Sequence, residues 1–130
     1  MAGTNGAEGK ALQPLGWIAS SRKDLRKFPR DVQQAIGQAL FDAQAGEKHP
    51  DAKPLKGFGG AGVLEIVEHH DGNTYRAVYT VKFAGIVYVL HVFQKKSKSG
   101  SKTPVEEISK IQKRLKEAEI DYAKWSKNKG

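Results

Sequence analysis

Arginine, histidine and lysine side chains recur in the second half of the chain at a spacing that can place them on one side of a β-sheet. Arg76, His91 and Lys95 are the main examples. Arginine and lysine can stabilise the charge that develops on an attacked phosphate, and histidine can exchange a proton near neutral pH. These residue types favour metal-free cleavage of RNA, in which the 2′-hydroxyl attacks the adjacent phosphate.

Two turn signals predict how the strands that carry these residues pair with one another. Asp71-Gly72 is a strong hairpin signal, and Ala84-Gly85 is a weaker one because alanine disfavours a positive φ. They join three expected strands at residues 63–69, 74–83 and 86–95. Two-residue turns at both places fix the register of all three strands, since a slip of one residue would turn every side chain to the other face.

This register predicts one apolar and one mixed face of the sheet. On the apolar face Tyr79 lies opposite Leu90 and Val81 lies opposite Tyr88, and we expect the helices to cover this face. The other face has three rows, which are Glu65 with Val78 and His91, Val67 with Arg76 and Phe93, and His69 with Thr74 and Lys95. Cationic groups on a partly apolar surface suit a phosphodiester, and Phe93 could stack on a base.

Each of these residues also has a purely structural explanation. Arg76 could be a solvated residue or the partner of Glu65 or Glu68. His91 lies between two apolar residues, as structural histidines often do, and Phe93 could pack beneath the last helix. The lysine-rich segment 95–102 could be a solvated loop.

The remaining chain predicts a short strand and three helical pieces. We expect a strand at residues 15–19, a helix that Ser20 or Ser21 caps, and a second helix from Arg30 that ends near Gly46. Residues 46–62 contain Pro and Gly and predict a loop that carries Lys53 and Lys56. The last helix opens at Pro104, with Thr103 as its N-cap. The predicted fold class is α+β.

Composition limits the classes of protein to which this chain can belong. Its 130 residues, with 38% hydrophobic and 28% charged residues, fit one globular domain at residues 14–126, between a flexible leader at 1–13 and a disordered tail at 127–130. The sequence has no cysteine, so disulfide scaffolds and thiolate chemistry are excluded. We see no metal motif, cofactor motif, signal peptide or membrane segment, and we expect a cytoplasmic protein. The formal net charge of +8 favours RNA or an acidic protein as partner.

Three segments resemble the RelE/HigB toxins, specifically the HigB-like, phage-derived Gp49-like branch. They are LKGFGGAGVLEIVE, YRAVYTVKFAGIVYVLHVFQKKSKSG and TPVEEISKIQKRL, and the similarity spans about residues 14 to 122. The resemblance implies a RelE-like fold with an N-terminal strand, a helical hairpin, a three-stranded antiparallel meander and a C-terminal helix. It also implies the toxin of a type II toxin–antitoxin pair, an mRNA interferase that cuts mRNA in the ribosomal A site and that a HigA-like helix-turn-helix antitoxin neutralises.

The resemblance also suggests roles for individual residues. It implies that Lys56 and Arg76 hold the scissile phosphate, that Lys95 supports the reaction, and that His91 acts as acid or base. The RelE arginine and tyrosine near the C-terminus have no counterpart here. The residues that we expect to contact RNA outside the reacting centre are Lys53, His69, Phe93, Lys96 and Lys98.

Two other functions remain open at this point. The protein could be a non-catalytic inhibitor of gyrase, like the ParE toxins, or an RNA- or ribosome-binding module without cleavage. If the chain is a nuclease, replacement of Arg76 by alanine should abolish toxicity without unfolding the protein.

Overall fold

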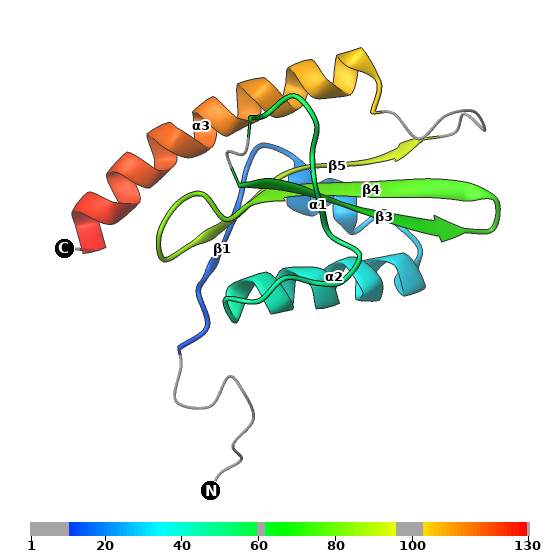
Figure 1. Ribbon diagram of the computed structural model, residues 1–130, viewed down its shortest axis with the longest axis horizontal. Helices are drawn as coiled ribbons and strands as arrows, with labels where there is room; N and C mark the ends of the chain where they lie inside the picture. The colour runs from blue at the N-terminus through cyan, green and yellow to red at the C-terminus, as the bar shows by residue number, and fades with distance from the viewer. Residues whose placement is uncertain (1–10, 60–61, 96–102, 130) are drawn as a thin grey trace, which may run out of the picture.

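The computed structural model describes residues 11–59, 62–95 and 103–129, which form a five-stranded sheet between two long helices (Figure 1). The elements in chain order are β1 (Leu15–Trp17), α1 (Ser21–Leu25), α2 (Arg30–Gln44), β2 (Lys53–Pro54), β3 (Val63–His70), β4 (Asn73–Thr80), β5 (Val87–Lys95) and α3 (Val105–Lys129). The strand order is β1-β5-β4-β3-β2, with β1 parallel to β5 and the other neighbours antiparallel. The predicted α+β class and element order are confirmed, and β2 is an additional short edge strand.

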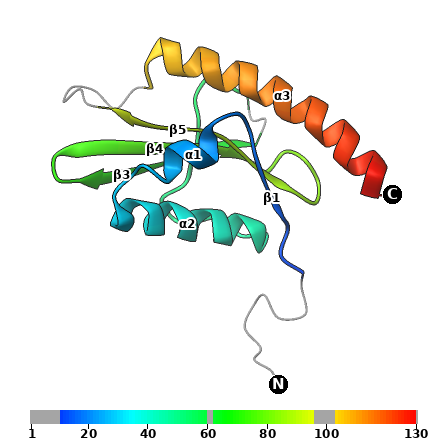
Figure 2. The ribbon, with the colours of Figure 1, turned by 180° about the vertical axis from the view of Figure 1, so that it is seen from behind.

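The two long helices cover opposite faces of the sheet (Figures 1 and 2). On one face, Ile36 and Leu40 of α2 pack in a core with Ile66 and Tyr79. On the other face, Ile111 of α3 belongs to a second core, whose strand members include Val78, Tyr88 and Leu90. The expectation of one helix-covered face is therefore wrong. The sheet face with the polar rows is also covered in part, because α3 crosses it.

The predicted register holds for β3–β4 and for the first half of β4–β5. Val78 lies opposite His91 as expected, but Tyr79 then lies opposite Val89 rather than Leu90, and Thr80 lies opposite Tyr88. The two predicted pairs, Tyr79 with Leu90 and Val81 with Tyr88, are wrong because a β-bulge inserts one residue into β5.

The bulge has a packing reason. Leu90 belongs to the core beneath α3, whereas its neighbour Val89 belongs to the core beneath α2. The extra residue allows both Leu90 and His91 to face α3. The connection between β4 and β5 spans residues 81–86 rather than two residues, and Phe83 within it is buried against Tyr88 and Tyr122.

Gly16 allows β1 to lie directly against a buried aromatic ring. A Cβ atom at Gly16 would lie 2.5 Å from Cε1 of Tyr88, whose ring is fully buried and whose hydroxyl donates to Asp121 over 2.7 Å. We expect Gly16→Ala to lower the free energy of unfolding by about 1–3 kcal/mol, because the ring cannot move away without loss of its contacts. Urea unfolding measures this change.

Gly37 provides the matched control for Gly16. It lies on the exposed side of α2, and an added Cβ would meet nothing within 4 Å. Gly37→Ala should raise the stability by about 0.5–1 kcal/mol, because alanine is the better helix former. Equal stabilities of the two alanine variants would contradict this account of β1.

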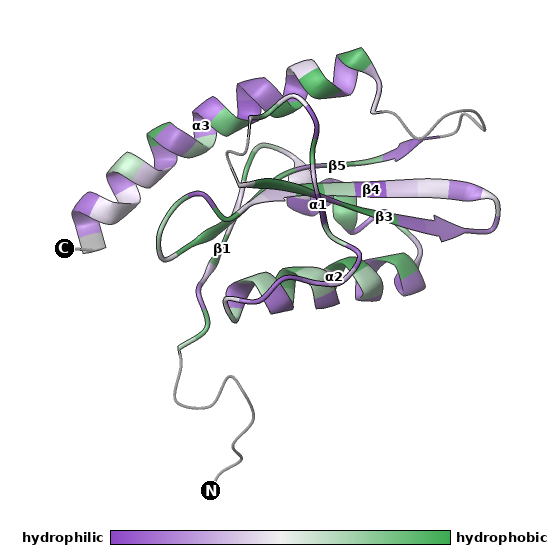
Figure 3. Ribbon diagram, viewed as in Figure 1, coloured by the Kyte–Doolittle hydropathy of each residue, from purple (hydrophilic) through white to green (hydrophobic). Residues whose placement is uncertain are grey.

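The ends of the strands carry the hydrophilic residues of the sheet. Figure 3 shows β3 and β5 turning hydrophilic toward their last residues, at the end of the sheet where α3 begins. Within the described residues, no helix is both long and apolar enough to span a membrane.

Candidate functional site

The three polar rows form as the sequence predicts on the sheet face toward α3. Glu65 lies opposite Val78, which lies opposite His91, and Arg76 is the partner of both Val67 and Phe93. Thr74 pairs with His69 and Lys95 in the third row. The structure adds Lys53 of β2 to the first row, opposite Glu65. Four strands therefore supply polar side chains to one end of the sheet.

Arg76 is buried and forms an ion pair with Glu65. Its Nη1 donates to Glu65 Oε2 over 2.8 Å, and the exposed fractions of the two side chains are 3% and 13%. Thr103, just before α3, donates its hydroxyl to the same Glu65 oxygen over 2.8 Å. The sequence predicted Thr103 as a helix cap, and the structure shows that its hydroxyl joins the start of α3 to β3.

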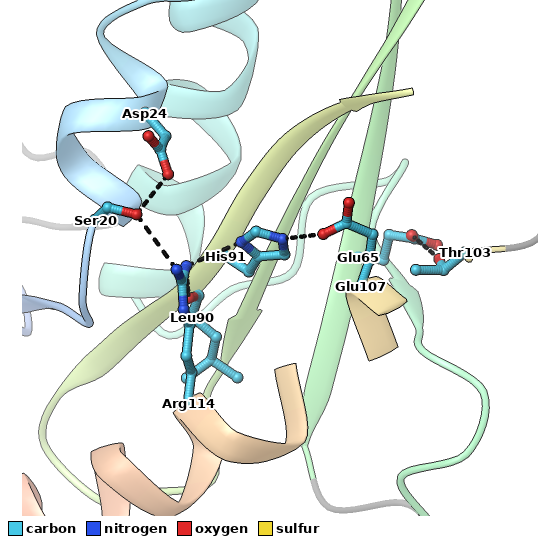
Figure 4. A network of polar contacts seen from close by, with 8 residues as sticks. All are labelled: Ser20, Asp24, Glu65, Leu90, His91, Thr103, Glu107 and Arg114. Carbon is cyan, nitrogen blue, oxygen red and sulfur yellow. Dashed lines mark hydrogen bonds and ion pairs between the residues drawn. The ribbon is translucent and has the colours of Figure 1, made fainter. Parts of the chain in front are cut away.

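His91 is held between two residues of α3, one at each ring nitrogen (Figure 4). Arg114 Nη1 lies 2.9 Å from Nδ1, and Glu107 Oε1 lies 2.5 Å from Nε2. A guanidinium group can only donate, so Nδ1 must be the acceptor and Nε2 carries the proton that Glu107 accepts. His91 is therefore neutral in this arrangement.

Burial lowers the pKa of His91 below its usual value, and the positive charges of Arg114 and Lys110 lower it further. The hydrogen bond to Glu107 opposes this shift. The ring also stacks on Phe93, with centroids 5.0 Å apart. Both ring nitrogens form hydrogen bonds to α3, so His91 holds α3 against β5.

Arg114 extends the network from His91 to α1. It also donates to the Leu90 carbonyl over 3.1 Å and to Ser20 Oγ over 3.3 Å (Figure 4). Ser20 in turn donates to Asp24 over 2.7 Å. One polar chain thus joins α3, β5 and the beginning of α1.

The other predicted site residues lie around this centre at different places. Lys56 is exposed in the loop after β2. Because β2 runs antiparallel to β3, residues after Lys53 lie progressively farther from Arg76, and Lys53, opposite Glu65, is the nearer of the two lysines. His69 is exposed and lies 3.2 Å from the Thr74 hydroxyl. Lys95 is half-buried at the end of β5. Lys96 and Lys98 lie outside the described residues.

Phe93 does not present its ring to solvent. Only 8% of the residue is exposed, and the ring stacks on His91. The position of Phe93 therefore fits the interpretation as a packing residue better than the interpretation as a residue that stacks on a base.

Sequence reasoning named Glu65 only as an alternative ion-pair partner of Arg76, and it assigned no site role to Glu107 or Arg114. The sequence placed Glu65 in the correct row, and the cationic Arg76 in the neighbouring row indicated an ion pair. Glu107 and Arg114 are seven residues apart, with the buried Ile111 between them, so they share the inner face of α3. This spacing is visible in the sequence, but the partner that lies beneath the helix is not.

Comparison with known proteins assigns the family. A model for the family described as "Phage derived protein Gp49-like" matches residues 23–116. The chain belongs to this family. No curated protein matches the sequence significantly.

This Gp49-like protein has the fold of the RelE toxin. An arginine-to-alanine double mutant of E. coli toxin RelE in the free state matches with a TM-score of 0.54 and 21% identity, over 80% of this chain and 98% of that chain. The toxin–antitoxin complex RelBE2 from Mycobacterium tuberculosis matches with a TM-score of 0.44 and 22% identity, over 68% of this chain and 97% of the matched chain. The match to RelE confirms the RelE-like fold of the Gp49-like chain.

Proposed function

We propose that this protein is the toxin of a type II toxin–antitoxin pair and that it cleaves mRNA on translating ribosomes. The observation that supports cleavage is the Arg76–Glu65 pair on the polar side of a RelE-like sheet. It brings together a fixed cation and a carboxylate, which can stabilise the charge on the attacked phosphate and accept the proton of the 2′-hydroxyl. A helix-turn-helix antitoxin of the HigA type is the proposed partner, besides the ribosome and its mRNA.

In the proposed reaction, Glu65 accepts the proton of the 2′-hydroxyl as its oxygen forms a bond to phosphorus. Arg76 stabilises the negative charge on the five-coordinate phosphate. The bond from phosphorus to the 5′-oxygen breaks, and this oxygen takes a proton from Lys95, which lies two residues beyond the Arg76 partner Phe93 on β5. When RNA binds at Arg76, the 2′-hydroxyl takes the place of the Thr103 hydroxyl as a hydrogen-bond donor to Glu65.

His91 has a different role in this proposal from that of an acid or base. Its two ring nitrogens are engaged by Arg114 and Glu107, so it positions α3 beside the reacting groups. Lys53 and His69, which lie on the same sheet face, contact the RNA backbone outside the reacting phosphate.

The burial of Arg76 and His91 also favours a second candidate, a non-catalytic inhibitor of the ParE type. In that case both residues would only stabilise the fold. Such a protein would arrest growth and leave mRNA intact.

Mapping of mRNA 5′ ends after brief induction of the protein in cells tests the proposed function. The messages are a translated mRNA and a copy without its start codon. We expect cuts only in the translated message, and none with the protein in which Arg76→Met is combined with Glu65→Gln. Growth arrest with intact mRNA would support the inhibitor instead, and the absence of both effects would contradict both toxin functions.

A further inference from the structure

A second basic surface lies on α1, the turn that follows it and the first residue of α2. We call it the α1 basic surface, and its members are Arg22, Lys23, Arg26, Lys27 and Arg30. All five side chains are exposed, and none forms an ion pair with another residue in the part of the chain that the structure describes. Neither the family resemblance nor the cleavage site accounts for this concentration of charge.

The nearby acidic groups do not neutralise this surface. Asp24 and Asp31 are the two acidic residues between positions 20 and 31, against five cationic ones. The Asp24 carboxylate accepts a hydrogen bond from Ser20, within the polar chain that leads to Arg114. The surface therefore keeps a net positive charge.

The backbone that carries these cations is fixed by the fold. Leu25 is buried in the core beneath α2, and Ser21 Oγ donates to the Val89 carbonyl over 3.2 Å. After the helix, Gln33 donates to the Phe28 carbonyl over 2.8 Å, and the Phe28 ring lies 4.8 Å from that of Tyr75. A ligand that contacts the side chains thus meets a backbone that is already ordered.

Hydrogen bonds through Arg114 link the start of α1 to the candidate cleavage site. Arg114 bonds both to Ser20, at the start of α1, and to His91, in the row that contains Glu65. The exposed Lys110, one turn before Arg114 on α3, adds positive charge close enough to act on the His91 ring. Figure 4 shows this path from Ser20 to His91.

We propose that the α1 basic surface binds the phosphodiester backbone of the RNA strand that is cut, beside the scissile phosphate. This inference rests on the proposed function, because it names the same substrate. Exposed cations on a fixed backbone suit a regularly spaced polyanion, and they bind it through charge rather than through recognition of bases.

The test is equilibrium binding of a short single-stranded 2′-O-methyl RNA, which cannot be cut because its 2′-oxygen is blocked. In the test variant, glutamine replaces Arg22, Lys23, Arg26 and Lys27. In the control variant it replaces four exposed lysines elsewhere, Lys48, Lys116, Lys124 and Lys127. The two variants have the same net charge, so a general loss of charge cannot explain a difference. Thermal unfolding checks that both are folded.

We expect the test variant to bind the RNA at least about tenfold more weakly than the control. Its plot of log affinity against log salt, between about 50 and 200 mM, should be shallower by about 2–3, because each lost phosphate contact on single-stranded RNA removes about 0.7 from the slope. A further protein with Arg22→Lys and Arg26→Lys should bind as the wild type does, since it keeps both charges.

Two other outcomes overturn the inference, and a third overturns only the proposed cleavage. Equal affinities of the test and control variants would exclude the α1 basic surface as an RNA site, whether or not the wild type cuts mRNA. If the test variant binds the oligonucleotide as the wild type does but no longer co-sediments with ribosomes, the surface binds ribosomal RNA instead. If only the test variant loses binding but the wild type cuts no mRNA, the surface stands and the proposed cleavage fails.

Discussion

The protein with Arg76→Met and Glu65→Gln together is expected to fold and to lose at least about 100-fold in mRNA cleavage. Removal of a fixed cation that stabilises transition-state charge typically costs this much. The double replacement removes both partners of the buried ion pair, and buried pairs can be exchanged for uncharged residues without loss of stability. Cleavage of a reporter mRNA in a translation extract, with urea unfolding of the same samples, measures both effects.

Replacement of Arg76 alone does not separate function from folding. Arg76→Ala would leave Glu65 charged and largely buried, and such a change typically lowers the free energy of unfolding by about 3–5 kcal/mol. The sequence predicted that Arg76→Ala would not unfold the protein, and the buried pair makes this expectation unsafe. Cleavage at the wild-type rate by the folded double variant would exclude Arg76 and Glu65 from the reaction.

The free energy of unfolding is expected to fall as the pH drops below about 6.5, and His91 is the cause. The pKa of His91 is lowered in the folded protein, so below the usual histidine value the unfolded chain binds the proton more readily. Folding then loses stability by up to about 1.4 kcal/mol per pH unit, until the pH reaches the lowered pKa. Above pH 6.5 this contribution to the pH dependence vanishes, because the ring is neutral in both states.

The comparison of two glutamine variants isolates this effect. His91→Gln should lose this part of the pH dependence, because glutamine has no titratable ring to place between the side chains of Glu107 and Arg114. Lys110, whose charge also acts on the His91 ring, is unchanged in this variant. His69→Gln is the control, since His69 is exposed on β3. Urea unfolding at several pH values provides the data. A wild-type stability that stays constant below pH 6.5 would contradict the neutral His91.

The cleavage assay separates the positioning role of His91 from proton transfer. If His91 only holds α3 in place, folded His91→Gln protein should keep most of the activity, and its pH profile should keep its shape. Loss of one limb of that profile would instead restore His91 as the acid or base.

The sequence by itself determined which side chains share a face of the sheet along β3 and in the first half of β4. The Asp71-Gly72 turn and the two-residue period of the strands placed Glu65 opposite Val78 and Arg76 opposite Val67 correctly, because both are local properties. His91 lies opposite Val78 as predicted from a turn at Ala84-Gly85, but only because the extra residue of the bulge offsets the different register next to that turn. The register failed beyond Val78, since the bulge arises from the packing of Leu90 beneath a helix that begins ten residues after β5 ends. Strand patterns carry no information about such a distant contact.

Only the tertiary structure decided what those side chains do within the fold. The sequence left Arg76 either exposed or paired, and the structure shows it paired with Glu65. Thr103, just before α3, donates a hydrogen bond to the same carboxylate. The sequence likewise left His91 as a catalyst or a structural residue, and α3 occupies both ring nitrogens. Burial and hydrogen-bond partners depend on how α3 lies across the sheet, and that is set by residues far apart in the sequence.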